Sequence, residues 1–215
     1  MKRKAFAIAT AAGAALGLAT VAAAAVIVGT PGNDVLLGTP RADHIRALDG
    51  SDWVRGRAGD DRIGAGKSSD RAEGGPGNDT VLGGAGNDSL GGGPGGDVVK
   101  GGTGNDGVHG GPASDRVYGN QGDDRVHGGS GDDRTFGGFG ADRSYGGPGN
   151  DTLHALALDG QRDLLDCGPG DDTARVRAAE KDLTSIVGCE TVVYVDVPTA
   201  EEAAEETADT DAEAE

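Results

Sequence analysis

The repeated unit of the chain is clearest in residues 74–91, which read GGPGNDTVLGGAGNDSLG. Two nine-residue units follow one another without a gap, and each has glycine at its first, second and fourth positions and aspartate at its sixth. Outward from this stretch, the period holds over residues 29–154, which divide into fourteen consecutive nonapeptides with no insertion. Self-similarity at a fixed short period indicates a repeat architecture rather than a conventional domain.

The nine positions differ sharply in what they accept. Position six is aspartate in all fourteen units, from Asp34 to Asp151. Position one is glycine in twelve units, position four is glycine in eleven, and position eight is valine, isoleucine or leucine in eleven. Glycine adopts positive φ without steric cost, so the glycine-rich positions suit turn conformations. A three-residue strand at positions seven to nine would put position eight on one face and positions seven and nine on the other.

The apolar side chains at position eight predict a thin interior between stacked strands. Such a core is small for so long a repeat region, and glycine adds to the entropy lost on folding. A further stabilising interaction is therefore required. The predicted core residues are Leu36, Ile45, Val54, Ile63, Val81, Leu90, Val99, Val108, Val117, Val126 and Leu153.

The overall composition excludes several classes of protein. Of 215 residues, 42 are glycine and only 3% are aromatic, which is too little bulk for an ordinary globular core. Collagen is excluded because glycine does not recur at every third residue and there are only eight prolines. The formal charge of −17 argues against nucleic acid or an anionic membrane surface as a partner.

The nonapeptide resembles GGxGxDxUx, where U is a large apolar residue, the repeat of the RTX (repeats-in-toxin) calcium-binding family. The resemblance covers residues 29–154 directly. It implies an all-β fold, a parallel β-roll in which GGxGxD forms a turn and xUx a short strand. Two nonapeptides make one coil, so fourteen imply about seven coils.

Physical chemistry independently favours calcium in such a roll. Odd and even repeats would fall on opposite edges, so Asp34 and Asp52 share one edge while Asp43 and Asp61 share the other. Carboxylates stacked about 4.8 Å apart repel one another unless cations lie between them. Calcium is a hard cation that takes six to eight oxygen ligands, and glycine-rich turns expose backbone carbonyls. We therefore expect folding to depend on several Ca²⁺ ions.

The predicted metal residues are the position-six carboxylates and position-one glycines of the better-matching turns. They are Asp34, Asp61, Asp79, Asp88, Asp97, Asp106, Asp124, Asp133, Asp142, Asp151, Gly74, Gly83, Gly92, Gly101, Gly128 and Gly146.

Some turns depart from the consensus and are expected to bind weakly or not at all. The third repeat lacks the first two glycines, and the second, fifth and tenth repeats have Arg41, Ser68 and Ala113 in place of the fourth-position glycine.

The alternative to calcium binding is a glycine-rich β-solenoid without metal, in which aspartate serves turn geometry alone. The absence of any Asn, Ser or Gly at position six favours calcium.

The N-terminal segment has the features of a secretory signal. Lys2, Arg3 and Lys4 precede an alanine-rich apolar run, and three alanines before Val26 offer a cleavage site. A retained membrane anchor is the alternative, because the uncharged run is long enough to span a bilayer. Its low hydrophobicity favours cleavage and no stable membrane span.

The C-terminal segment 199–215 carries eight acids and no base, and we expect a disordered acidic tail. The chain is thus divided into a signal segment (1–25), a β-roll (26–154), a C-terminal cap (155–198) and this tail.

The expected cap begins where three added residues, Ala155 to Ala157, break the period. Cys167 and Cys189 are the only cysteines, and an even pair in an exported chain predicts a disulfide, with free thiols as the alternative. A cap is needed because a solenoid must cover its last open edge. The DCGPGDD stretch followed by CE resembles a terminal segment of secreted bacterial calcium-binding repeat proteins.

The sequence contains no pattern that indicates catalysis. No GxSxG motif accompanies the histidines, and acid pairs such as Asp60–Asp61 are positions five and six of a turn. The first acid of each pair is interpreted as a solvated or capping side chain. A calcium-dependent hydrolase remains the least favoured alternative.

Outward positions carry aromatic and basic residues at 18-residue spacing, with arginines beside them at position seven. They predict two ladders that could bind a cell-surface glycan or a protein partner through ring faces and guanidinium groups. The alternative is in-register stacking that supports only the fold. The ladder residues are Tyr118, Phe136 and His154 on one face, and His109, His127 and Tyr145 on the other.

Taken together, these features predict a secreted calcium-binding β-roll, extracellular or associated with the cell envelope. We expect a non-enzymatic structural or adhesion module. The alternative is a calcium-dependent surface for a glycan or protein.

Overall fold

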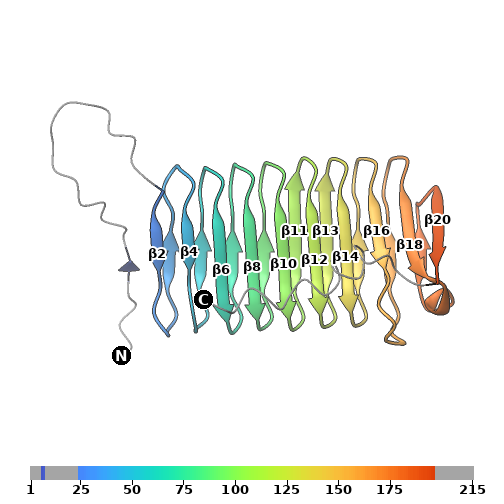
Figure 1. Ribbon diagram of the computed structural model, residues 1–215, viewed down its shortest axis with the longest axis horizontal. Helices are drawn as coiled ribbons and strands as arrows, with labels where there is room; N and C mark the ends of the chain where they lie inside the picture. Colours follow the sequence, from blue (N-terminus) through green and yellow to red (C-terminus); the bar gives the residue numbers. More distant parts are fainter. Residues whose placement is uncertain (1–5, 8–23, 197–215) are drawn as a thin grey trace.

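The computed structural model describes residues 6–7 and 24–196, which wind into a solenoid of stacked β-strand coils (Figure 1). The predicted all-β parallel β-roll is confirmed. Most of the expected signal segment and all of the expected acidic tail lie outside the described residues.

The described strands form two parallel sheets, with one strand of each sheet in every coil. In the repeat region, strands of one sheet pair at a register of 18 residues, as in Val99 with Val117. Two nonapeptides therefore make one coil, as predicted.

Sheet A contains the odd-numbered strands. They are β1 (Phe6–Ala7), β3 (Val35–Leu37), β5 (Trp53–Arg55), β7 (Arg71–Glu73), β9 (Ser89–Gly91), β11 (Gly107–Pro112), β13 (Arg125–Ser130), β15 (Arg143–Tyr145), β17 (Leu164–Asp166) and β19 (Ser185–Val187). Sheet B contains the even-numbered strands. They are β2 (Val26–Val28), β4 (His44–Arg46), β6 (Arg62–Lys67), β8 (Thr80–Ala85), β10 (Val98–Thr103), β12 (Arg116–Gln121), β14 (Arg134–Phe139), β16 (Thr152–Ala155), β18 (Thr173–Arg177) and β20 (Thr191–Val195).

The roll has more coils than the seven expected from the nonapeptides, since β2 to β19 make nine successive pairs of described strands. At one end, β2 lies before the first nonapeptide and pairs with β4. At the other end, the segment expected to form a cap continues both sheets. The three added residues lengthen the coil, so Ser144 pairs with Leu165 and Leu153 with Ala174, 21 residues apart. The extra length is accommodated in the loop between β16 and β17 without loss of strand register.

All eleven predicted core residues at position eight are buried. Ten of them form most of a hydrophobic cluster that runs from Ile27 to Val126, while the eleventh, Leu153, belongs to a second cluster that includes the cysteine pair. Between the two, position eight is occupied by Thr135 and Ser144, both with 0% exposure. Among the described residues, their hydroxyl oxygens have no hydrogen-bond partner, so the core contains a polar interruption.

The C-terminal coils are joined by the predicted disulfide between Cys167 and Cys189, whose Cα atoms are 5.2 Å apart. A 3₁₀ turn at Ala178–Glu180 links β18 to β19. In the described part of the chain, no helix is long and apolar enough to cross a membrane.

Candidate metal centre

The turns of the roll have a left-handed backbone at two fixed points. Positions two and four have positive φ in every nonapeptide from the third to the fourteenth. Glycine occupies most of these positions, but five other residues also adopt positive φ there, between 79° and 89°. The turn geometry is therefore imposed by the stack even where the glycine is missing. These five residues are Leu48, Arg57, Ser68, Ala113 and Asn120.

One carboxylate oxygen of each position-six aspartate supports the stack. The backbone amide of Asp79 donates to Oδ1 of Asp97 at 2.7 Å, and that of Asp88 donates to Oδ1 of Asp106 at 2.7 Å. The same bond links aspartates 18 residues apart from Asp34 to Asp151, on both edges. Aspartate thus has a structural role, as the metal-free alternative supposed, but this role uses only one oxygen.

In twelve of the column aspartates the second oxygen, Oδ2, is buried and accepts no hydrogen bond from any described residue. A buried carboxylate oxygen without a partner is costly, so the fold leaves these oxygens to be satisfied by something else. The residues concerned are Asp52, Asp61, Asp70, Asp79, Asp88, Asp97, Asp115, Asp124, Asp133, Asp142, Asp151 and Asp172.

The position-one glycine lies directly against this oxygen. A Cβ built on Gly110 would lie 2.5 Å from Oδ2 of Asp115 and 2.6 Å from the carbonyl oxygen of Gly128 in the next coil. Only glycine leaves this space, which we call the cradle, open to the two oxygens. The other position-one glycines beside their own Oδ2 are Gly29, Gly38, Gly56, Gly74, Gly83, Gly92, Gly101, Gly119, Gly128, Gly137 and Gly146.

Two repeats lack the cradle for a simple chemical reason. Ala47 and Ala65 occupy position one of the third and fifth repeats, and each is fully buried. Their methyl groups stand where the other turns have no side chain. This difference agrees with the expectation that Asp52 and Asp70 belong to poor turns.

The first two repeats differ in another way, and here the structure departs from the prediction for Asp34. The Thr30 amide donates to Oδ2 of Asp34 at 2.5 Å, and the Thr30 hydroxyl donates to the same oxygen at 3.0 Å. The Thr39 amide makes the equivalent bond to Asp43 at 2.5 Å. Neither threonine adopts the positive φ of a position-two glycine. The Oδ2 of Asp34 is therefore satisfied within its own turn.

One cradle was missed from the sequence. The missing fourth-position glycine predicts a poor turn at Asp115, yet Ala113 in that position has a φ of 89°, the same positive φ as the glycines of the other turns. Gly110 and Gly111 at positions one and two were the signal that could have identified it. Open cradles therefore lie beside nine of the ten predicted aspartates, all except Asp34. A further open cradle lies beside Asp115.

Burial is the largest cause of the raised pKa values among the column aspartates. Burial raises the pKa of Asp124 to about 8. The hydrogen bond from the Asp106 amide lowers this pKa, while the charges of Asp142, Asp106 and Asp123 raise it further. The pKa of Asp61, Asp97, Asp133 and Asp142 rises to about 7 with burial again the largest cause. A cation at Oδ2 would favour the ionised form of these groups.

The described residues contain no cluster of three or more His, Cys, Asp or Glu side chains that could hold a metal by themselves. Each cradle instead offers one carboxylate oxygen, and most also offer a backbone carbonyl oxygen from the adjoining coil. Such a mixed oxygen set suits calcium, which accepts carbonyl ligands readily.

Position five forms a separate outer ladder. The Asn78 amide donates to Oδ1 of Asp60 at 2.9 Å, and the Asn105 amide donates to Oδ1 of Asn87 at 2.9 Å. The first acid of the Asp60–Asp61 pair therefore caps a backbone amide of the next coil, as interpreted from the sequence. The hydrogen bonds within and between turns therefore explain why acids occur in pairs at positions five and six.

The ladder predicted on sheet B is not an accessible surface. Tyr118, Phe136 and His154 are only 5%, 1% and 5% exposed. Their rings stack face to face, with centroids 4.7 Å apart for Tyr118 and Phe136 and 4.2 Å apart for Phe136 and His154. Stacking at this spacing covers the ring faces, so the expectation of an exposed contact surface is wrong for these three residues.

The ladder on sheet A is more open. His109 is exposed, while His127 and Tyr145 are partly buried and stack with centroids 4.4 Å apart. Burial lowers the pKa of His127, and the neighbouring His109 and Arg125 add to the effect. Arg125 and Arg143, which precede these rings by two residues, are exposed.

Comparison with known proteins agrees with the geometry of the turns. The family model for the RTX calcium-binding nonapeptide repeat (4 copies) matches at residues 28–63, 37–72, 64–99, 91–124, 100–135, 109–144 and 136–157. A search of the curated proteins found no match to the chain. Because the family matches overlap to cover residues 28–157, well over half of the sequence, the chain belongs to the RTX calcium-binding nonapeptide repeat family.

Proposed function

We propose that the protein binds several Ca²⁺ ions along both edges of the roll and that this binding completes its folding. The observation that carries the proposal is the row of buried Oδ2 atoms, most of them beside a position-one glycine that has no side chain to fill the cradle. A cation there would satisfy the orphaned oxygens and cancel repulsion within each column. The expected ligands are Asp61, Asp79, Asp88, Asp97, Asp106, Asp115, Asp124, Asp133, Asp142 and Asp151, with carbonyls of the position-one residues.

The metal-free alternative explains less of the site. Asparagine at position six would supply the Oδ1 acceptor equally well, so the amide ladder alone does not require aspartate. The buried charge at Oδ2 would then be an uncompensated burden repeated in coil after coil. A cation in the cradle removes that burden.

We further propose that the protein is exported and acts as a non-enzymatic structural or adhesion module, extracellular or envelope-associated. The basic and apolar N-terminal segment 1–25 supports export, and the disulfide suits an oxidising compartment. Calcium is scarce inside cells and abundant outside, so the chain would complete its folding after export.

Circular dichroism of the full chain in calcium-free buffer at neutral pH, with Ca²⁺ or Mg²⁺ added, tests the proposal. We expect a β-rich spectrum to develop with Ca²⁺ and not with Mg²⁺, and calorimetry to report multiple ions per chain. A fully developed β spectrum without calcium, together with no binding heat, would refute it.

A second candidate function is a calcium-dependent contact surface for a glycan or protein on sheet A. The observation that favours it is the partly exposed row of His109, His127 and Tyr145 beside Arg125 and Arg143. A double substitution His127→Ala and Tyr145→Ala should abolish binding to cells or glycan arrays while calcium binding persists. Unchanged binding would rule out this surface.

A further inference from the structure

The cradle of the fourteenth repeat has an unusual wall. A Cβ on Gly146 would meet Oδ2 of Asp151 and the carbonyl oxygen of Cys167. Cys167 occupies position one of the segment 167–175, where twelve of the fourteen nonapeptides have glycine. Its carbonyl also accepts the Gly147 amide at 3.0 Å, just as Gly92 accepts the Gly75 amide at 2.8 Å. The disulfide cysteine thus lines the last glycine cradle of this edge.

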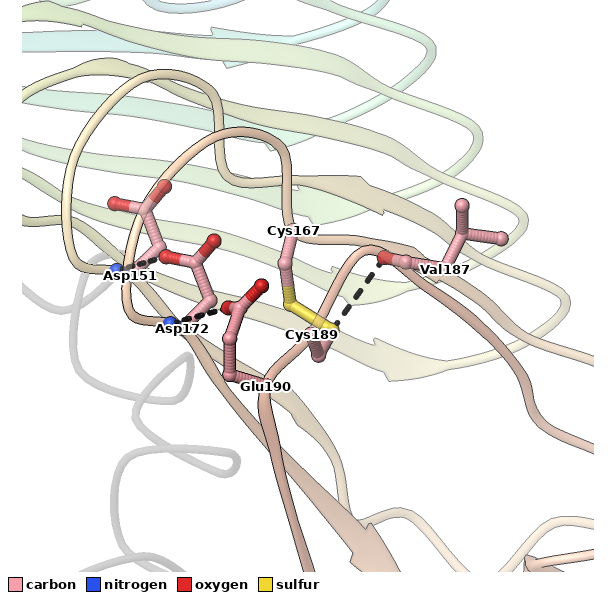
Figure 2. Close-up of a disulfide and its surroundings, with 6 residues drawn as sticks. All are labelled: Asp151, Cys167, Asp172, Val187, Cys189 and Glu190. Carbon is pink, nitrogen blue, oxygen red and sulfur yellow. Dashed lines mark hydrogen bonds between the residues drawn. A yellow bond between two sulfur atoms is a disulfide. The ribbon is translucent and has the colours of Figure 1, made fainter.

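The turn beyond Cys167 is shortened. Between β19 and β20 only residues 188–190 connect the two sheets, where a nonapeptide has six turn residues. Glu190 nevertheless continues the acid column, because the Asp172 amide donates to its Oε2 at 2.8 Å as the Asp151 amide donates to Oδ1 of Asp172 at 2.7 Å (Figure 2).

The Cys167 amide donates to the Val187 carbonyl at 3.0 Å, as the Gly74 amide donates to that of Gly91, but among the described residues no six-residue turn stacks beyond Cys167. In the earlier cradles of this edge where a next-coil carbonyl lines the space, such as that of Gly110 with the Gly128 carbonyl, the residue that supplies the carbonyl belongs to a complete turn with a further turn behind it. At Cys167 the covalent bond to Cys189 takes that role, and Figure 2 shows the disulfide beside the three carboxylates at the end of the column. The adjoining Asp172 is 1% exposed, and its Oδ2 has no partner among the described residues.

We infer that the carbonyl of Cys167 is a ligand of the last Ca²⁺ on this edge and that the disulfide to Cys189 positions it. The inference rests on the proposed function of calcium binding. It follows that occupancy of this cradle and the redox state of the disulfide are coupled. Binding free energies are reciprocal, so if the disulfide strengthens Ca²⁺ binding, then Ca²⁺ must make the disulfide harder to reduce by the same factor.

The direct test is a redox titration of the full chain with oxidised and reduced dithiothreitol, in Ca²⁺ or in Mg²⁺. Reduction breaks the S–S bond and yields two thiols, taking two electrons and two protons from dithiothreitol, which closes to its cyclic disulfide. We expect the equilibrium constant for reduction to fall about tenfold in Ca²⁺, a shift of about 30 mV for this two-electron couple. An unchanged equilibrium in a chain that still binds Ca²⁺ by calorimetry would overturn the inference but leave the proposed function standing. A chain that binds no Ca²⁺ at all overturns both.

Two matched substitutions separate a local coupling from general stabilisation of the roll. Asp151→Asn removes the charge from the cradle lined by Cys167 but keeps an Oδ1 acceptor for the Asp133 amide. Asp79→Asn makes the same change on the same edge, far from the disulfide. Asp151→Asn should lose most of the calcium effect on reduction, whereas Asp79→Asn should lose one ion and keep the effect. Equal effects of the two substitutions would show a global origin and overturn the inference.

The reciprocal measurement is the calcium isotherm of Cys189→Ser, which breaks the cross-link and leaves Cys167 in place. We expect one ion fewer, or one ion bound at least tenfold more weakly, with the remaining ions unchanged. Circular dichroism in saturating Ca²⁺ verifies that the roll still forms. An isotherm identical to that of the oxidised parent would contradict the positioning role of the disulfide.

Discussion

At the scale of single residues, each turn divides one carboxylate between two tasks. Oδ1 of a position-six aspartate accepts a backbone amide of the preceding coil, and Oδ2 faces the cradle beside the position-one glycine. Glycine at position one acts here by lacking a Cβ, whereas glycine at positions two and four acts by allowing positive φ. These distinct roles lead to two predictions.

Filling one cradle should remove one ion, because the added methyl group displaces the oxygens that line the cradle. Gly110→Ala places a methyl group against Oδ2 of Asp115 and the Gly128 carbonyl. We expect calorimetry to report about one Ca²⁺ fewer per chain. The matched control is Gly91→Ala, where an added Cβ meets nothing within 4 Å. If both variants bind as many ions as the parent, the cradle is not the binding site.

Relieving backbone strain should stabilise the roll. Ala113 has a φ of 89° at position four, a region that disfavours residues with a Cβ by roughly 1–2 kcal/mol. Ala113→Gly should therefore raise the stability of the calcium-loaded protein by about 1 kcal/mol, measured by thermal or denaturant unfolding. Ala85→Gly, at a position without positive φ, is the control and should give no gain. A loss of stability in Ala113→Gly would contradict this account.

At the scale of strands and coils, the interior is a row of mostly apolar side chains from each sheet, one from position eight of each strand. Thr135 pairs with Val117 on one side and Leu153 on the other, so its hydroxyl lies in line with apolar neighbours. Together with Ser144 it separates the two hydrophobic clusters. A buried hydroxyl without a partner weakens the core at this coil.

Replacing that hydroxyl by a methyl group should strengthen the coil. Thr135→Val keeps the shape of the side chain and removes the unpaired oxygen, and we expect a gain of about 1–2 kcal/mol in the free energy of unfolding. Thr152→Val serves as control, because Thr152 is only partly buried at position seven on the outer face of β16. Equal gains in the two variants would mean that burial of the Thr135 hydroxyl is irrelevant.

At the scale of the whole molecule, two acid columns run along the length of the roll, so its stability must depend on pH and on cations together. Burial raises the pKa of eleven column aspartates between Asp52 and Asp151 from 3.8 to between about 6 and about 8. The folded, metal-free chain therefore holds protons that the unfolded chain has already released. Its stability is greatest near and below pH 4 and decreases as the pH rises through this range.

We accordingly expect the calcium-free chain to hold more β-structure at pH 4.5 than at pH 7.5. Circular dichroism in calcium-depleted buffers measures this, with saturating Ca²⁺ at pH 7.5 as reference. Because protons and Ca²⁺ compete for the same carboxylates, calcium affinity should rise from pH 5.5 to pH 7.5. A calcium-free chain that gains β-structure on raising the pH would contradict the assignment of these groups.

Much of this architecture followed from the chain alone. The resemblance to the RTX repeat predicted the turns and the strand pairing at 18 residues, and strand geometry predicted the buried side chain at position eight, because each depends on local conformation repeated in register. The cysteine pair predicted the disulfide, which the structure confirms. The number of coils was underestimated, since β17 to β20 join the sheets by strand pairing despite their weaker match to the repeat.

The composition of each site was decided by tertiary structure. The sequence determined that aspartate recurs at position six, but only stacking revealed that Oδ1 is used by the backbone while Oδ2 is left buried. The sequence also could not reveal that Thr30 donates a hydrogen bond to Oδ2 of Asp34, or that Phe136 is buried in a ring stack. These outcomes depend on atoms 18 or more residues away, or on the path of the backbone through a turn. A periodic sequence determines which residues recur in register, whereas the distances between coils decide which of their atoms remain available to a ligand.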